Sequence, residues 1–313
     1  MPYDESVPPT PRRRPPRAAA ALAVISLCLT AAGCGAADDD GLPGRAAEPR
    51  PGGDGTPAAA PSAPKPDRTS AASSGPSGPS PRAVDRTVSG PLSGKTVVID
   101  PGHNPDNRLH TREINRHVDI GTGRKACDTT GTATESGYAE ARFTLDVSRR
   151  VRDLLRAQGA KVVLTQDGDR PYGPCVDERA RIGNEAGADA VVSVHADGSA
   201  VGNRGFHVIL PGLVRAGKAD TSKIVDPSRD LGARIAGLFL RATGSAPSNY
   251  VGGKTGLDVR KDLGGLNLST VPKVFIECGN MRDPKDAALL SSAGWRQKAA
   301  QGITDGISGY LNR

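Results

Sequence analysis

The stretch Val97-Val98-Ile99-Asp100-Pro101-Gly102-His103 predicts a buried strand that ends abruptly at a histidine. Three consecutive β-branched residues favour an extended backbone inside a sheet, and Pro101-Gly102 supplies the turn that ends it. The histidine is therefore expected at a strand end, where α/β proteins place their functional groups. His103 is thus a candidate metal ligand, and the alternative is a hydrogen-bonded structural residue.

A second histidine follows another predicted buried strand in the same way. The strand is Ala190-Val191-Val192-Ser193-Val194, and His195 stands directly after it. Two imidazoles at two strand ends suggest a metal, because the carboxyl ends of parallel strands meet at one edge of a sheet. A hydrolytic zinc site normally has three N or O ligands from the protein plus water, so one further ligand is expected.

The third ligand is expected among acidic residues near strand ends or helix starts, which are Glu113, Glu135, Glu140, Asp197 and Glu277. Glu140 stands out because it lies in the first turn of a predicted amphipathic helix, where a rigid backbone fixes its direction. The other interpretation of Glu140 is a carboxylate that stabilises the helix dipole.

Glu277 is unusual because it closes the apolar strand Val274-Phe275-Ile276. A carboxylate there is costly unless it is paired or functional. Beside a metal it could take the proton of an attacking water and return it to a leaving amine. The structural alternative is an ion pair with an arginine such as Arg282 or Arg179.

Predicted strands and helices alternate along residues 94–313, which form the expected catalytic domain. Strands are expected at 97–101, 161–165, 190–195, 205–210 and 273–277, and helices at 138–158, 177–186, 231–241, 286–290 and 295–311. Residues 104–136 lack apolar periodicity and are predicted to be one long loop. The alternation predicts a three-layer α/β/α domain with a mainly parallel twisted sheet.

The N-terminal region predicts export. Arg12, Arg13, Arg14 and Arg17 precede an uncharged run, residues 18–32, that is too short to cross ~30 Å of hydrocarbon comfortably, so residues 1–33 are expected to be a signal peptide. Ala32-Gly33-Cys34 resembles a bacterial lipobox, in which the cysteine is lipidated, although Ala31 stands where Leu is usual. We expect a lipoprotein held on the membrane through Cys34 and facing the cell wall. The alternative is cleavage nearby and a secreted enzyme.

Residues 34–93 have the composition of a tether. Gly, Pro, Ala and Ser fill 39 of these 60 positions, so the segment cannot bury enough apolar surface to offset its ordering entropy, and we expect it to be disordered.

The charge pattern argues against a nucleic-acid partner. Residues 94–313 carry 31 Lys and Arg against 25 Asp and Glu, without a dense basic block. Aromatic residues are only 3% of the chain, so stacking platforms for single-stranded nucleic acid are scarce. The surplus of positive charge is compatible with binding to an anionic polymer or a membrane surface. The chain also lacks a Gly-x-Ser-x-Gly elbow, a Walker loop and a His-Glu-x-x-His helix.

Three cysteines remain in the expected domain. Cys278 follows a buried strand and is expected to be inert, so Cys127 and Cys175 are the natural pair in an oxidising compartment. The alternative is two unpaired thiols.

Five pieces in this order resemble the Amidase_3 family of zinc-dependent N-acetylmuramoyl-L-alanine amidases, in its disulfide-containing subgroup. They are residues 98–103, Gly137-Tyr138-Ala139-Glu140, Val176-Asp177-Glu178-Arg179 with Asn184, residues 193–197, and residues 275–281. The resemblance implies one Zn²⁺ ion bound by His103, Glu140 and His195, with Glu277 as the catalytic carboxylate. It covers residues 95 to about 311. The chain departs from many members in the residue after His103, which is Asn104, and in the length of the following loop.

The resemblance also implies the reaction and its substrate. A zinc-activated water would cleave the amide between the muramic acid lactyl group and the L-alanine of the stem peptide, in peptidoglycan or soluble muropeptides, with a monomeric enzyme expected. Two other functions stay open on the sequence: a lipid-tethered peptidoglycan-binding protein without activity, and a zinc peptidase acting on the stem peptide.

Overall fold

The computed structural model describes residues 89–313, so the predicted signal peptide, Cys34 and nearly all of the predicted tether lie outside the described residues. The centre of this part is a six-stranded sheet with the spatial order β4-β1-β5-β10-β6-β9. The strands are β1 (Thr96–Pro101), β4 (Lys161–Leu164), β5 (Ala190–Asp197), β6 (His207–Pro211), β9 (Leu257–Arg260) and β10 (Lys273–Asn280).

The sheet is mainly parallel, as expected. β4, β1, β5 and β10 run in one direction, whereas β6 pairs antiparallel with β10 and β9 pairs parallel with β6. The carboxyl ends of β1, β5 and β10 therefore share one edge of the sheet. That edge receives the residues that follow these strands.

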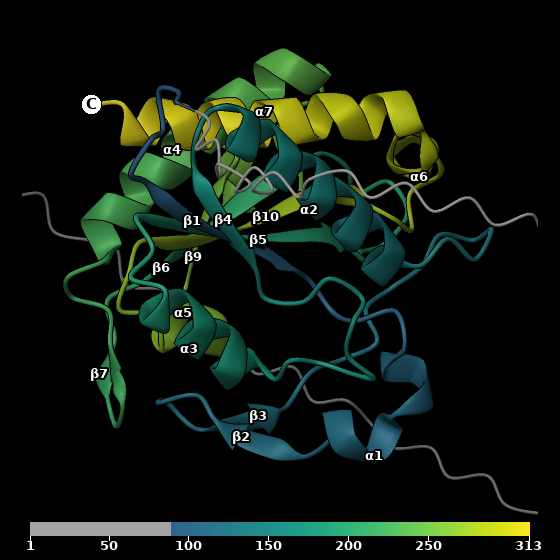
Figure 1. The fold of residues 1–313 in the computed structure, drawn as a ribbon. Coiled ribbons are helices and arrows are strands. Elements are labelled where there is room, and N and C mark those ends of the chain that lie inside the picture. Colours follow the sequence, from purple (N-terminus) through teal and green to yellow (C-terminus); the bar gives the residue numbers. More distant parts are fainter. Residues whose placement is uncertain (1–88) are drawn as a thin grey trace, which may run out of the picture. The chain divides into compact units, whose positions relative to one another are not determined.

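Helices cover both faces of the sheet and complete three layers (Figure 1). On one face lie α2 (Glu140–Ala157), α4 (Val225–Thr243) and α7 (Ala293–Leu311), with α6 (Pro284–Ser291) at the N-terminal end of α7. The opposite face carries α3 (Val176–Glu185) and the short α5 (Gly264–Asn267). Among residues 89–313 no helix combines the length and apolarity that a membrane span needs.

The two faces of the sheet differ in polarity because side chains alternate along each strand. On β10, Val274 and Ile276 join the large apolar core beneath α2, α4 and α7. Lys273, Phe275 and Glu277 have the opposite parity and face the α3 and α5 side. Polar and charged side chains on this second face surround the candidate site, while the first face supplies most of the apolar burial that stabilises the domain.

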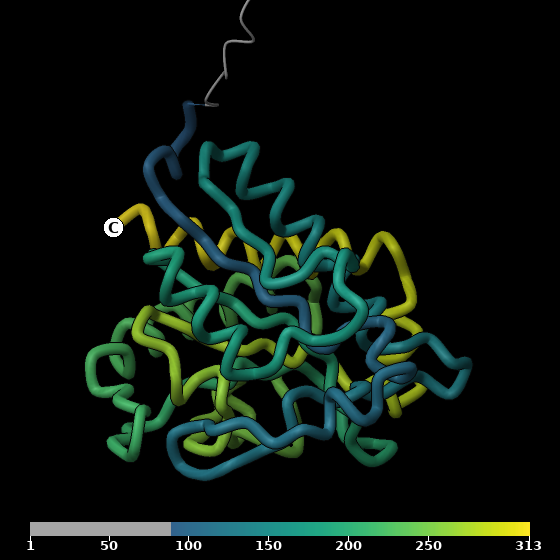
Figure 2. The backbone as a smooth tube through the Cα atoms, turned by 60° about the horizontal axis from the view of Figure 1, so that its bottom comes forward, coloured from purple at the N-terminus to yellow at the C-terminus, as the bar shows by residue number. Residues whose placement is uncertain are grey.

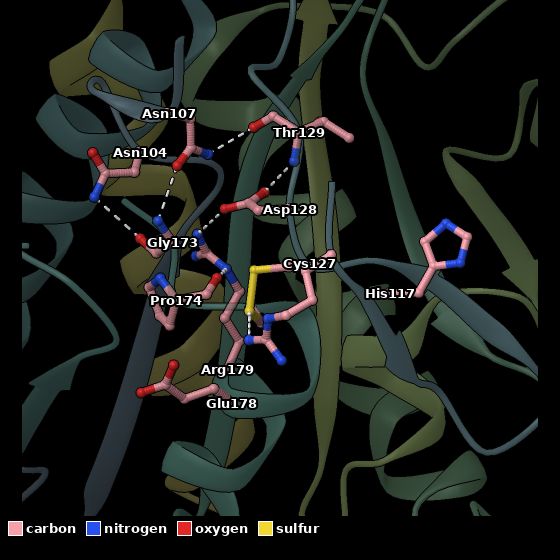
Figure 3. The surroundings of a disulfide bond; sticks show 12 residues. Asn104, Asn107, His117, Cys127, Asp128, Thr129, Gly173, Pro174, Glu178 and Arg179 are labelled. Atoms are coloured by element: carbon pink, nitrogen blue, oxygen red, sulfur yellow. Dashed lines mark hydrogen bonds and ion pairs between the residues drawn. A yellow bond between two sulfur atoms is a disulfide. The ribbon is translucent and has the colours of Figure 1, made fainter. Parts of the chain in front are cut away.

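The segment predicted as one long loop contains short elements instead. These are η1 (Asn107–Leu109), α1 (Thr111–Ile114) and the hairpin of β2 (His117–Asp119) with β3 (Arg124–Ala126). Figures 1 and 2 show this blue segment leaving β1 as a long excursion and passing α3 before α2 begins. Its elements are too short for apolar periodicity to reveal. The Cys127–Cys175 disulfide, as predicted, joins the end of the hairpin to the residue before α3 (Figure 3), and Cys278 is free and buried.

Two further differences have local causes. α4 begins at Val225, six residues before the predicted start, because its first turn contains Pro227 and polar residues and shows no apolar period. β9 was not predicted, because its sequence Leu-Asp-Val-Arg has no apolar run and none of its residues is buried, whereas the equally short edge strand β4 contains Val-Val-Leu. A second small hairpin, β7 (Arg215–Ala216) with β8 (Ala219–Asp220), and the turn η2 (Gly252–Lys254) were also missed.

Candidate metal centre

His103, Glu140 and His195 form one cluster at the shared edge of the sheet. One ligand atom from each of the three residues lies within 4.8 Å of the other two. Glu140 Oε1 is 3.1 Å from His103 Nε2 and 3.0 Å from His195 Nδ1. The two imidazole rings meet nearly at right angles, with 5.0 Å between their centroids. Residues more than 90 positions apart are thus brought together by strand ends and one helix start.

His103 follows β1 in a left-handed backbone conformation, with φ of 60°. Its Nδ1 lies 3.1 Å from the carbonyl oxygen of Thr129 and 3.5 Å from Asp128 Oδ1. A proton on Nδ1 would be donated to the carbonyl oxygen of Thr129. The free lone pair of the neutral ring would then be on Nε2, on the side of Glu140. Burial disfavours the imidazolium, but the carboxylates of Glu140 and Asp128 outweigh burial and raise the pKa of His103 to about 10, so a metal ion that binds Nε2 must displace a proton at neutral pH.

Glu140 is the first residue of α2 and is buried, with both carboxylate oxygens occupied. Oε1 faces the two histidines and accepts from the backbone N–H of Ala196 at 3.2 Å, and Oε2 accepts from the N–H of Thr132 at 2.9 Å. Burial raises the pKa of Glu140, but His103 and His195 outweigh that effect and hold the pKa below its ordinary value. Glu140 is therefore a fixed anion between two imidazoles.

His195 lies two residues before the end of β5, and its ring is held by stacking. The ring of Phe275, on neighbouring β10, lies 5.2 Å away and only 17° from parallel. Thr144, in the second turn of α2, also holds the backbone just before His103, because its Oγ1 donates to the carbonyl of Gly102 at 2.6 Å. Both imidazoles are thus positioned by rigid elements.

Glu277 lies beside this cluster, paired in register with His195 across β5 and β10 and with His207 across β6 and β10. It lines the open cavity of about 270 Å³ that also contains His103, Glu140 and His195. Its Oε2 is buried and has no hydrogen-bond partner among the described residues. Burial, followed by the carboxylates of Glu140 and Asp197, raises the pKa of Glu277 above its ordinary range.

The structural alternative for Glu277, an ion pair with Arg179 or Arg282, does not occur among the described contacts. Arg179 instead binds Asp100 and Asp128. The other acidic candidates also lie apart from the cluster or are already engaged. Glu113 is on α1 beside His110, Glu135 is exposed, and Asp197 accepts a 2.6 Å hydrogen bond from the hydroxyl of Tyr250.

Asp128, Tyr250 and the partners of Arg179 were not predicted from the sequence. Asp128 directly follows Cys127, so the predicted disulfide was the one signal that pointed to its neighbourhood. His207 is buried on β6 opposite Glu277, with its Nδ1 also unpartnered within residues 89–313. His117 is exposed and His110 half-buried, both outside the site.

The donor set fits a divalent metal ion. Two imidazoles and one carboxylate supply N and O ligands of the kind found in three-ligand catalytic metal sites. The orientation of the His103 ring by Thr129 is the usual accompaniment of a metal-binding histidine. The unpartnered oxygen of Glu277 in the same cavity adds a proton acceptor beside that set.

Comparisons with known proteins agree with this architecture. The family model for Amidase_3, N-acetylmuramoyl-L-alanine amidase, matches residues 97–309. An N-acetylmuramoyl-L-alanine amidase of Mycobacterium tuberculosis is 42% identical over 225 residues, which are 70% of this chain and 88% of that protein. The crystal structures of the amidase Ami1 from Mycobacterium smegmatis and of apo Ami1 from Mycobacterium abscessus are each 40% identical, with a TM-score of 0.64. They cover 70% of this chain and 98% and 100% of theirs. The chain therefore belongs to the Amidase_3 family of N-acetylmuramoyl-L-alanine amidases.

Proposed function

We propose that this protein is a peptidoglycan hydrolase that cleaves the amide between the muramic acid lactyl group and the L-alanine of the stem peptide. In this proposal His103, Glu140 and His195 hold a single zinc ion and Glu277 is the catalytic carboxylate. The observation that carries it is the convergence of three ligand atoms within 4.8 Å beside the unpartnered oxygen of Glu277.

Bound zinc would supply a Lewis acid for the scissile carbonyl and would lower the pKa of a water molecule held beside it. The protein's own part is to orient the ligands and to move the proton. Thr129 and Asp128 fix the ring of His103, and Phe275 fixes the ring of His195. The substrate carbonyl would then meet the cluster in one orientation.

The two buried glutamates divide the chemistry between them. Glu140 has hydrogen-bond or ionic partners on both oxygens, so it has no free oxygen with which to accept a further proton. Glu277 has a free buried Oε2 and a raised pKa, so it can accept the water's proton and deliver it to the departing L-alanine nitrogen. The same physical difference separates an electrostatic carboxylate from an acid–base one in other hydrolases.

Defined muropeptides test the substrate and the bond. The purified protein should release an intact stem peptide and leave a glycan that keeps its lactyl group, as read by mass spectrometry. Release of a terminal amino acid would favour a stem-peptide peptidase instead. Retained glycan binding without any released peptide would favour a binding protein.

The proposal includes the predicted organisation outside the described residues. Residues 1–33 act as a lipoprotein signal, Cys34 carries the lipid, and residues 34–93 tether the catalytic domain, residues 94–313, to the membrane as a monomer facing the cell wall. The composition of these segments supports this arrangement. Replacement of Cys34 by Ser should move the protein from the membrane fraction to the medium. An unchanged distribution would favour the secreted alternative.

A further inference from the structure

Arg179, on α3, uses all five of its guanidinium N–H groups in the interior of the protein. Its side chain is almost completely buried. The acceptors are Asp100 Oδ1 at 2.7 Å, the carbonyl of Pro101 at 2.6 Å, the carbonyl of His103 at 3.0 Å, Asp128 Oδ2 at 2.9 Å and the carbonyl of Pro174 at 2.8 Å. A guanidinium fork fully satisfied in this way is rigid, because no donor is left for another partner.

These contacts reach His103 by two routes. One is the hydrogen bond to the His103 carbonyl, which supports a backbone in the left-handed region that a residue with a side chain seldom adopts without help. The other is the ion pair with Asp128, whose second oxygen lies 3.5 Å from His103 Nδ1. Arg179 therefore acts on both the main chain and the ring of the same histidine.

The Cys127–Cys175 disulfide lies next to two of the groups that accept hydrogen bonds from Arg179. Asp128 follows Cys127, and Pro174 precedes Cys175, so both segments that hold Arg179 are tied together covalently (Figure 3). Asn107 adds a second link, because its amide nitrogen donates to Thr129 and its oxygen accepts from the N–H of Gly173. The acceptors around Arg179 therefore have little freedom to follow a displaced side chain.

We propose that Arg179 is a positioning residue that holds the imidazole of His103 in the orientation needed for metal binding. This inference rests on the proposed function, in which His103 is a zinc ligand. It assigns Arg179 a role that a buried ion pair with Asp100 alone would not have. A lysine at this position keeps the charge but cannot reproduce five hydrogen bonds in a fixed plane.

Lys273 provides a matched control. It is fully buried on β10 and its ammonium lies 3.1 Å from the other oxygen of Asp100, yet among the described contacts it touches neither His103 nor Asp128. Its loss removes a buried cation from the same aspartate without touching the histidine. Comparison of variants at Arg179 and Lys273 therefore separates a specific effect on His103 from general destabilisation caused by the loss of a buried charge.

The test measures zinc dissociation constants by competition with a chromophoric chelator, together with melting temperatures of the zinc-free proteins. Loss of partners behind a metal-binding histidine typically weakens affinity about 10–100-fold, which is the change we expect for Arg179→Lys. Lys273→Met should lower the melting temperature but leave zinc affinity within about threefold of wild type, because it removes no group in contact with the His103 ring. Its ammonium also lies 5.5 Å from the centre of the Phe275 ring, and methionine keeps an apolar side chain against that ring. Equal zinc affinity in Arg179→Lys and wild type, or equal losses in both variants, would overturn the proposal.

Two further measurements keep the outcome clear. If Arg179→Lys does not fold, Asp128→Asn removes the same ion pair and the carboxylate beside Nδ1, and should also weaken zinc binding about tenfold or more. Unchanged affinity in that variant would contradict the inference. A crystal structure of zinc-free Arg179→Lys should have the His103 ring displaced from Thr129, and an unmoved ring would contradict the inference. Wild-type protein that binds no zinc would contradict the proposed function separately.

Discussion

Nδ1 of His195, two residues before the end of β5, lies 3.0 Å from Oε1 of Glu140, the first residue of α2. The contact joins a strand end to a helix start that is 55 residues away in the sequence. Because Glu140 also meets His103 through the same oxygen, any change at one member alters the electrostatics of all three. This shared oxygen makes the ligand set sensitive to single substitutions.

Replacement of His195 by Ala should abolish zinc binding, because two remaining protein ligands fall short of the three that catalytic zinc sites use. Metal analysis of the purified protein should fall from about one zinc per chain to a trace. His117→Ala, at an exposed position on β2, is the control and should retain its zinc. Full stoichiometric zinc in His195→Ala would rule out its assignment as a ligand.

Glu277→Gln should lower kcat by about 10²–10⁴-fold, because it removes the proton acceptor while keeping the size of the side chain. Zinc content and melting temperature should stay near the wild-type values. Glu113→Gln, outside the cavity, should digest muropeptides at the normal rate. The role of Glu277 would be wrong if its Gln variant released stem peptide as fast as the parent.

The double substitution of Cys127 and Cys175 by Ser should destabilise the protein by about 4 kcal/mol in the chain-entropy model, because the bridge closes a loop across 48 positions. Urea unfolding measures the loss. Addition of a reductant should lower the stability of wild type by a similar amount and leave the double variant unchanged. A difference of under about 1 kcal/mol would mean that the bridge contributes little to the folded state.

Asp100→Asn should destabilise the protein in a pH-dependent way. Burial raises the pKa of Asp100, but Lys273 and Arg179 outweigh that effect and hold the pKa below its ordinary value. The ionised carboxylate therefore contributes stability above the unfolded-state pKa of about 3.9, and this contribution is lost as the pH falls toward the lower folded value.

At pH 7 the free energy of unfolding of Asp100→Asn should be about 3–5 kcal/mol lower than that of wild type, because two buried cations lose their anion. The difference in the free energy of unfolding between wild type and Asp100→Asn should become smaller below about pH 4, where Asp100 begins to carry a proton in the unfolded chain. Urea titrations at pH 7 and pH 3 measure both values. Asp226→Asn, at an exposed position, is the control, and its free energy of unfolding should differ little from that of wild type at both pH values. A constant gap for Asp100→Asn would contradict the buried-charge account.

The large helices and strands could be predicted from the sequence because each contains a clear apolar run or apolar residues that recur at helical spacing. β1, β5 and β10 each contain an apolar run, and a site residue follows that run, so the edge holding His103, His195 and Glu277 could be anticipated. In the structure β5 and β10 continue past these residues, and His195 and Glu277 lie two and three residues before the strand ends. Glu140 was identified from its place in the first turn of α2. In the structure the three ligand candidates, His103, Glu140 and His195, lie together.

The missed parts depend on tertiary contacts that no local period encodes. The β2–β3 hairpin has strands of three residues each, too short for a pattern. Arg179 looks like one charged residue of a polar helix, yet it is buried because carbonyl and carboxylate groups from the end of β1 and from the loop at Asp128 converge on it. The pairing of Tyr250 with Asp197 likewise joins positions 53 apart across a loop.

Zinc removal and restoration tests the central claim most directly. Wild-type protein is incubated with a defined muropeptide in a strong chelator, then with zinc restored, and the products are identified by mass spectrometry. The account predicts that release of the intact stem peptide stops in chelator and returns at about one equivalent of zinc per chain. Cleavage of the lactyl amide that continues at full rate in zinc-free protein would contradict it.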